Sequence, residues 1–260
     1  MIVSTHQLTI GYEDYVVQES LDLDIRRGTM ICMLGPNGCG KSTLLRSLAG
    51  LQPPLQGDIN IFADGTPTPL RSLTQQQIAK LIALVLTERE SLDKTRVADI
   101  VSMGRYPYTD LRGKLTAADR RIVDSAIESV GLANMRDRYF NSLSDGEKQR
   151  ALIAKSLTQQ TPLILLDEPT AHLDLPNRIK TMLLLRRLAH EQQKAIVIST
   201  HELDIALQTA DLIWLMTPHN GIEKGTPEQL IANGSFERAF ADDSFHFVNQ
   251  SGHLNVVVRG

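Results

Sequence analysis

The chain has 260 residues, 42% of them hydrophobic, and its 30 acidic and 27 basic residues give a formal net charge of −3. This composition is typical of a globular protein with a sizeable buried core, and the lack of an overall basic field argues against nucleic acid as the main partner. No apolar run approaches the ~18 residues of a membrane-spanning helix, and no signal-peptide pattern opens the sequence, which predicts a cytoplasmic protein.

The first thirty residues predict a small antiparallel β layer. Apolar and polar residues alternate in short stretches, notably from Leu21 to Ile25, as in half-buried strands. Residues 30–34 are a continuous apolar run that ends at Gly35, and a helical pattern follows from Thr43 to Ala49. The two cysteines, Cys32 and Cys39, lie in this strand and loop, where a disulfide is a poor fit, so they indicate a reducing compartment.

Residues 35–43 read GPNGCGKST and match the phosphate-loop pattern G-x-x-x-x-G-K-[ST] in full. Glycines let backbone N–H groups surround phosphate oxygens, Lys41 can reach the terminal phosphates, and the Ser42 hydroxyl can bind Mg²⁺. A tight glycine turn with a solvated lysine is the bland alternative, which the strand–loop–helix context disfavours. The predicted ATP-binding residues are Gly35, Pro36, Asn37, Gly38, Cys39, Gly40, Lys41, Ser42 and Thr43.

The middle of the chain is mostly helical. Gly57 to Phe62 reads as another strand, and helical patterns then run from about 74 to 157, with breaks near 87–95 and 105–115. Thr116 to Asp119 is a capping box that opens a helix. The apolar side chains on one face of this helix are Ile122, Val123, Ala126, Ile127 and Val130.

An alternation of strands and helices returns after residue 160. Leu163 to Leu166 and Ala195 to Ser199 read as buried strands with helical crossovers, which predicts parallel pairing. Asp167 and Glu168 directly follow the first of these strands, at the edge where α/β proteins bind ligands. We expect Asp167 to hold Mg²⁺ and Glu168 to orient or deprotonate the attacking water, although solvated carboxylates at a strand end are an alternative.

Residues 143–147 read LSDGE and open another helical stretch. With the phosphate loop and Asp167-Glu168, this segment resembles the signature of the ATP-binding cassette (ABC) family, whose pattern is leucine, serine, glycine, glycine, glutamine. Asp145 and Glu147 depart from it. The resemblance implies that Ser144, Asp145, Gly146 and Glu147 face ATP on a partner subunit, in a homodimer with two composite sites. Alone, the segment would read as an N-cap and turn.

Further positions match the same family over roughly residues 3–225. By resemblance, Asp174 lies in a loop that faces the dimer partner, His201 contacts the terminal phosphate, and Tyr12 stacks on adenine. The alternatives are structural: His201 would be a polar residue at a strand end, and Tyr12 an ordinary aromatic residue of a strand. The family's Mg²⁺-contacting glutamine is replaced by Thr87, and we expect the Thr87 hydroxyl to ligate Mg²⁺ or hold its water. The adjoining Glu88 is the alternative metal ligand.

The family resemblance implies an α/β fold. We expect a P-loop NTPase core of mostly parallel sheet with helical crossovers, an N-terminal antiparallel β layer and an inserted α-helical subdomain. The ABC ATP-binding domain would span residues 1–225, with the helical subdomain at about 88–157. Residues 226–260 would be a C-terminal extension packed on the core.

The segment Gly104 to Tyr108 resembles a stretch found in ATPase subunits that serve importers of iron–siderophore complexes, haem and cobalamin. The exposed aromatics Tyr106 and Tyr108 would then dock a permease, while a proline-broken helix end is the alternative. The implied partners are a second ATPase subunit, integral membrane permease subunits and a separate substrate-binding protein. The chain would sit peripherally on the inner face of the cell membrane.

Three other functions deserve comparison with this interpretation. A soluble ABC ATPase in translation or DNA maintenance would carry two cassettes or a long insertion before the signature, and neither is present. A non-catalytic ATP-dependent assembly factor is disfavoured because Glu168 and His201 are both present. A small-molecule kinase would share the phosphate loop but leaves LSDGE and Asp174 unexplained.

Overall fold

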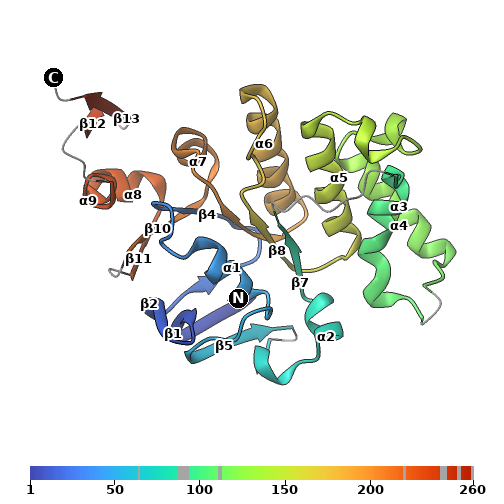
Figure 1. Cartoon of the computed structure of the whole chain (residues 1–260), viewed down its shortest axis with the longest axis horizontal. Helices are drawn as coiled ribbons and strands as arrows, with labels where there is room; N and C mark the ends of the chain where they lie inside the picture. The colour runs from blue at the N-terminus through green and yellow to red at the C-terminus, as the bar shows by residue number, and fades with distance from the viewer. Residues whose placement is uncertain are drawn as a thin grey trace.

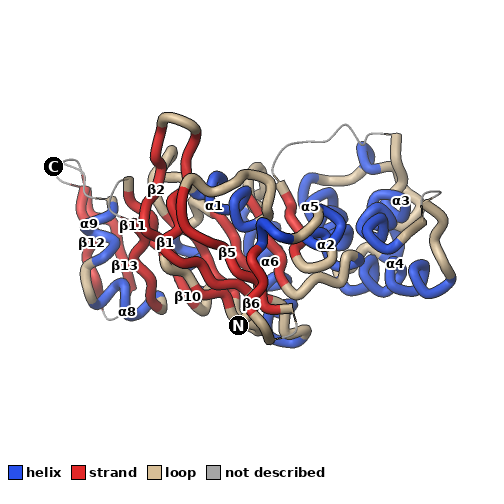
Figure 2. Tube along the Cα trace, turned by 90° about the horizontal axis from the view of Figure 1, so that it is seen from below, coloured by secondary structure: helices blue, strands red, loops and turns tan. Residues whose placement is uncertain are grey.

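The computed structural model describes residues 1–63, 65–86, 94–110, 113–218, 221–240, 245–250 and 253–258, the last two segments by their backbone alone. Two large sheets, a separate two-stranded sheet and the helices around them make up the described part of the chain (Figure 1). Turned by 90°, the strands gather to one side and helices α2 to α5 to the other (Figure 2). The predicted division into a sheet-rich core and an inserted helical segment is confirmed.

The N-terminal sheet is antiparallel, as predicted, and its strand order is β2-β1-β5-β6, with β3 also paired to β1. Its strands are β1 (Val3–Tyr12), β2 (Tyr15–Leu21), β3 (Asp24–Ile25), β5 (Gln56–Phe62) and β6 (Pro67–Pro69). The alternating stretch from Leu21 to Ile25 is divided between the end of β2 and β3. Thr5 lies between these ends, because its hydroxyl donates to the Leu21 carbonyl and accepts from the Leu23 N–H.

The second sheet has the order β11-β10-β4-β9-β8-β7 and is parallel except for the edge pair β10–β11. Its strands are β4 (Met30–Leu34), β7 (Ile82–Val85), β8 (Leu163–Asp167), β9 (Ala195–Ser199), β10 (Leu212–Thr217) and β11 (Gly221–Gly225). All residues of β4 and β9 are buried, which explains their continuous apolar runs. The carboxyl ends of β4, β8 and β9 therefore lie together at one edge.

Helices cover both faces of the parallel sheet. Helix α1 (Lys41–Leu48) packs between the two sheets, and α6 (Leu175–Glu191) and α7 (Leu203–Thr209) form the crossovers that flank β9. The fully buried Trp214 belongs to the cluster between the sheets. Cys32 and Cys39 are both free and buried, and burial raises the pKa of the Cys32 thiol to about 12.

The helical segment lies between β7 and β8 in the sequence. It contains α3 (Val97–Ser102), the 3-10 turn η2 (Met103–Tyr108), α4 (Ala117–Ser129) and α5 (Asp145–Thr158). The same segment also contains the short turns η3 (Ala133–Met135) and η4 (Phe140–Ser142). Two further short elements, η1 (Leu70–Ser72) and α2 (Gln75–Ala79), precede β7. The capping box at Thr116 is confirmed, and the predicted apolar face of α4 is buried except for the half-buried Ile122.

The C-terminal part begins with α8 (Pro227–Ala232) and α9 (Ser235–Ala239), followed by the antiparallel pair β12 (Phe245–Gln250) and β13 (His253–Val258). Leu230, Ile231 and Phe236 are buried in the same apolar cluster as α6 and the parallel sheet. These two helices thus help to close the core. No helix in the described part of the chain is long and apolar enough to cross a bilayer.

Candidate active site

The phosphate loop connects β4 to α1 and needs glycine at its two ends. The backbone φ angles of Gly35 and Gly40 are 155° and 104°, values that residues with a side chain rarely adopt. A Cβ on Gly35 would collide with the carbonyl oxygen of Met216, and one on Gly40 with the side chain of Val17. The loop is therefore pressed against β10 and β2, and only glycine fits these two positions.

Lys41 folds back across this loop. Its Nζ donates to the carbonyl oxygens of Gly35 at 2.8 Å and Pro36 at 3.1 Å, and the residue is only 6% exposed. The ammonium group thus lies inside the curve of the loop. An anion that enters the loop would meet this charge together with the backbone N–H groups at the start of α1.

Gln18 supports the loop from β2, a role that the sequence did not predict. Its Nε2 donates to the carbonyl oxygen of Cys39 at 3.0 Å and to that of Thr217 at 2.8 Å, which ties the loop to the end of β10. The side chain is 2% exposed. Its partners are 21 and 199 residues away, so no local sequence pattern identifies it.

Tyr12 ends β1 beside the phosphate loop. The residue is 55% exposed, and its hydroxyl lies 3.4 Å from Oγ1 of Thr43, in the first turn of α1. The ring is thus free to meet a planar group that approaches the loop from solvent.

Ser42 and Asp167 come together although 125 residues separate them. Oγ of Ser42 donates to Oδ1 of Asp167 at 3.1 Å, and Oγ of Ser199, at the end of β9, donates to the same oxygen at 2.5 Å. Two of the three predicted Mg²⁺ ligands therefore meet at the carboxyl edge of the parallel sheet. Hydroxyl and carboxylate oxygens are ligands of the kind that Mg²⁺ takes.

Glu168 is held in an unusual backbone conformation directly after β8. Its φ is 45°, and its N–H donates to both the carbonyl oxygen and Oγ of Ser199, at 3.1 and 2.9 Å. Its Oε1 lies 2.6 Å from Nε2 of His201. Both side chains are partly exposed, so a water molecule can reach the carboxylate. The contact with the imidazole fixes the orientation of the carboxylate.

The signature segment forms the N-terminus of α5, and its departure from the family pattern has a structural role. Ser144 is the N-cap, its N–H donates to Oε2 of Glu147 at 2.8 Å, and the Glu147 N–H donates to the serine hydroxyl. The hydrogen bond from the Ser144 backbone lowers the pKa of Glu147. Asp145 pairs with Lys148 at 3.5 Å.

The signature and the segment around Asp174 are neighbours. Asp174 is the N-cap of α6, and its Oδ1 accepts from the N–H of Asn177 at 3.0 Å. A Cβ on Gly146 would lie 2.8 Å from the side chain of Asn177, so α5 and α6 approach closely there. Among the described contacts, no hydrogen bond or ion pair joins residues 144–147 to the phosphate loop of the same chain.

The two tyrosines of η2 differ in their surroundings. Tyr106 is 59% exposed. The ring of Tyr108 lies 4.0 Å from the guanidinium of Arg105, and its hydroxyl donates to the carbonyl oxygen of Gln159 at 2.9 Å. Tyr106 is therefore available to a partner, whereas Tyr108 also supports the fold. Thr87 and the neighbouring Glu88 lie outside the described residues.

The comparisons with known proteins agree with this geometry. The family model for the ABC transporter matches residues 18–171. An uncharacterised ABC transporter ATP-binding protein of Methanocaldococcus jannaschii is 39% identical over 88% of this chain and 78% of its own length. The iron(3+)-hydroxamate import ATP-binding protein FhuC of Bacillus subtilis is 34% identical over 93% and 88%.

A solved structure gives the same result for the whole fold. A metal-chelate-type ABC transporter in an inward-facing conformation superposes with a TM-score of 0.81 and 28% identity, over 98% of this chain and 95% of the other. The chain therefore belongs to the ABC transporter family and is a nucleotide-binding subunit with the ATPase site of that family.

Proposed function

We propose that this chain hydrolyses ATP with Mg²⁺ as one half of a homodimer and powers the import of a metal chelate, of the iron–siderophore, haem or cobalamin type. The contact between Glu168 and His201 carries the catalytic part of this proposal. It lies at the same sheet edge as the pair formed by Ser42 and Asp167. In this proposal the base Glu168, the orienting His201, the pair that would bind Mg²⁺ and the phosphate loop act together at this edge.

Each of these residues has a separate role in the proposed mechanism. Lys41 Nζ exchanges its two carbonyl partners for terminal phosphate oxygens. Ser42 and Asp167 would hold Mg²⁺, and the ion would supply positive charge to offset that of the phosphates. The carboxylate of Glu168 accepts a proton from the attacking water, while Nε2 of His201 keeps that carboxylate aimed at the phosphate.

The homodimer follows from the separation of two parts of the site. Within one chain, no described hydrogen bond or ion pair joins the signature to the phosphate loop, so residues 144–147 would serve the nucleotide of a second copy. The N-terminus of α5 presents the Ser144 hydroxyl and a favourable dipole to such an anion. Asp174, exposed beside the signature, would meet the partner in the same interface.

The import part of the proposal rests on the relatives and on η2. One relative serves iron(3+)-hydroxamate import, and the similar structure is of a metal-chelate-type transporter. Membrane permease subunits, a separate substrate-binding protein and a position on the inner face of the membrane follow from that assignment. The exposed ring of Tyr106 would contact the permease.

The experiment that tests hydrolysis and dimerisation is Glu168→Gln. The amide keeps the shape but loses the basic oxygen, so the variant should bind ATP, turn over at least 100-fold more slowly, and elute as a dimer in ATP and Mg²⁺. Glu191→Gln, at the exposed end of α6, is the control and should hydrolyse ATP normally. A Glu168→Gln protein that stays monomeric with ATP bound would refute the composite site.

A further inference from the structure

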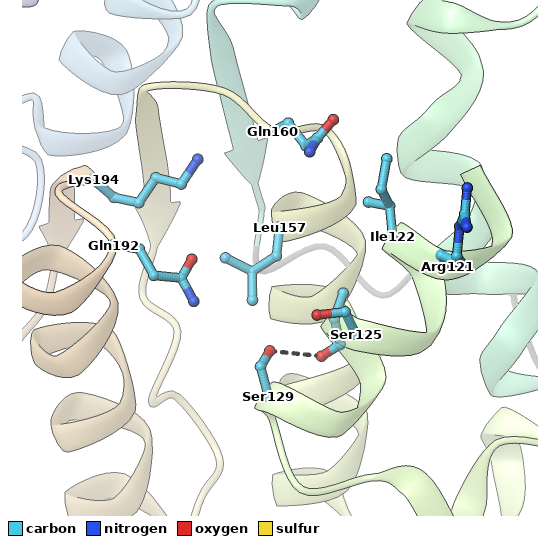
Figure 3. A pocket seen from close by; sticks show the side chains of 9 residues that line it. Arg121, Ile122, Ser125, Ser129, Leu157, Gln160, Gln192 and Lys194 are labelled. Atoms are coloured by element: carbon cyan, nitrogen blue, oxygen red, sulfur yellow. Dashed lines mark hydrogen bonds between the residues drawn. The ribbon is translucent and has the colours of Figure 1, made fainter. Parts of the chain in front are cut away.

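A cavity of about 470 Å³ lies between the helical segment and the core (Figure 3). Its lining residues are Arg121, Ile122, Ser125, Ala126 and Ser129 of α4, Leu157 and Gln160 at the end of α5, and Gln192 and Lys194 after α6. Gln160 precedes β8 and Lys194 precedes β9, so the cavity is at the amino edge of the parallel sheet. The phosphate loop is at the opposite edge, and the cavity volume is that of an ordinary ligand site.

The charges in this lining have one sign. Arg121 and Lys194 are cationic, and no aspartate or glutamate is among the lining residues. Within the described part of the chain, neither cation has an ion-pair partner. Lys194 donates to the carbonyl oxygen of Thr161 at 2.6 Å, and burial together with the neighbouring Arg27 lowers its pKa. A half-buried ammonium group without a counter-charge favours an anion beside it.

The neutral polar groups add further donors. Oε1 of Gln160 accepts from Nη1 of Arg105 at 2.9 Å, so the amide nitrogen of Gln160 is the end left for a ligand. Gln192 adds a second amide and Ser125 an exposed hydroxyl. In Figure 3, Lys194 and Gln192 lie on one wall and Ser125, Ser129 and Ile122 on the other, with Leu157 between them.

We propose that this cavity binds a small organic anion, a carboxylate or phosphate ester with an apolar body. The anionic group would take hydrogen bonds from Lys194, Gln192 and Gln160, with Arg121 at the rim. The apolar body would lie on the strip formed by Leu157, Ile122 and Ala126. None of these residues belongs to the nucleotide site.

The position of the cavity gives the ligand a regulatory role. One wall is α4 of the helical segment, and the other is the turn from α6 to β9 of the core. Next to it, Nη2 of Arg187 on α6 donates to the carbonyl oxygen of Ser129 on α4 at 2.9 Å. A ligand that contacts both walls would favour one arrangement of the two parts, and would thereby change ATP turnover at the other edge of the sheet.

The test is a titration of the full chain with phenyl phosphate and with benzoate, in saturating ADP and Mg²⁺ so that the nucleotide site is filled. Isothermal calorimetry should show saturable binding, while phenol, which has the ring without the charge, should not bind. Lys194→Gln should raise Kd at least about tenfold, because it removes a charge-assisted hydrogen bond. Arg121→Gln should raise Kd by a smaller factor, because it removes a positive charge at the exposed rim.

Two further variants keep the result interpretable. Ser125→Leu fills the cavity from an exposed position without breaking a buried contact, and should also abolish binding. Arg120→Gln, the exposed neighbour outside the lining, should bind as the wild type does. The proposal is overturned if neither anion saturates the protein, if phenol binds equally, or if Ser125→Leu and Arg121→Gln leave Kd unchanged.

Discussion

Nε2 of His201 lies 2.6 Å from Oε1 of Glu168, and this contact joins the residue after β8 to the second residue after β9. Because both side chains stand at strand ends, the rigid parallel sheet sets their separation. The carboxylate is therefore held in one orientation, which in the proposed mechanism reduces the reorganisation needed during proton transfer.

The first prediction follows from this pair. His201→Ala should lower kcat for ATP by about 100-fold with a smaller change in KM, because Glu168 stays but is no longer aimed. Steady-state phosphate release measures both constants. His190→Ala is a matched control, since His190 also contacts a carboxylate, Asp211 at 3.0 Å, outside the site. Equal losses in the two variants would contradict the orienting role.

The second prediction concerns Gln18. Gln18→Leu removes both hydrogen bonds and leaves the carbonyl oxygens of Cys39 and Thr217 without this donor, so unfolding should become easier by about 1–3 kcal/mol. The displaced loop should also raise the KM for ATP while kcat changes less. Chemical denaturation and ATP titration measure the two effects. Gln76→Leu, an exposed glutamine of α2, should change neither.

The third prediction is a pH dependence at Glu147. Its folded pKa lies below the ordinary value because the Ser144 N–H bonds the carboxylate. The charged group therefore stabilises the fold fully above its ordinary pKa of about 4.3, and this contribution is lost as pH falls through the lower folded pKa.

The substitution Glu147→Ala makes this measurable. At pH 7 it should destabilise the fold by about 1 kcal/mol, the value typical of a lost helix cap. The difference from the wild type should shrink below pH 4.5. Urea melts at a series of pH values give the curve, and a difference that stays constant down to the acid transition would show that the carboxylate charge is unimportant.

The fourth prediction contrasts two ion pairs on α4. Nε of Arg105 donates to Oδ1 of Asp119 at 2.8 Å, and their side chains are 7% and 8% exposed. Asp119→Asn should therefore destabilise the fold by about 3–5 kcal/mol, because it leaves a buried guanidinium unpaired. Asp124→Asn breaks the pair with Arg136, in which the Arg136 side chain is 43% and the Asp124 side chain 49% exposed. This variant should lower the free energy of unfolding by less than about 1 kcal/mol. Similar losses in urea melts would contradict this difference.

Local patterns predicted the strands and loops that carry the site. The apolar runs before Gly35 and Asp167 predicted where these strands end, because a parallel strand that is buried on both faces carries apolar side chains on both. The helix after the loop begins at Lys41, two residues before the predicted Thr43, since Gly40 completes the turn in a left-handed conformation. The first two residues of this helix, Lys41 and Ser42, are polar, so the apolar pattern that predicted the helix did not reach them.

Contacts between distant residues could not be predicted in the same way. Gln18 bonds a carbonyl 199 residues away, and the buried pair of Arg105 and Asp119 depends on how η2 meets α4. Glu147 departs from the family signature, and the sequence predicted no structural role for it, whereas its carboxylate completes the cap of α5. Such roles depend on backbone placement, which residue types alone do not specify.

The adjacency of β7 and β8 has a kinetic consequence. The chain leaves the sheet after β7, forms the helical segment and returns to the neighbouring strand β8. Pairing these two strands therefore closes a loop of roughly 80 residues. The entropic cost of closing it is about 4 kcal/mol if the loop is flexible. Gln159, after α5, donates to the carbonyl oxygens of Ala79 and Ile82, so a folded helical segment brings the start of β7 to the start of β8. We expect the α3–α5 packing to form before the transition state and the pairing of β7 with β8 after it. Ile100→Val, in α3, should then slow refolding, whereas Ile82→Val should mainly speed unfolding.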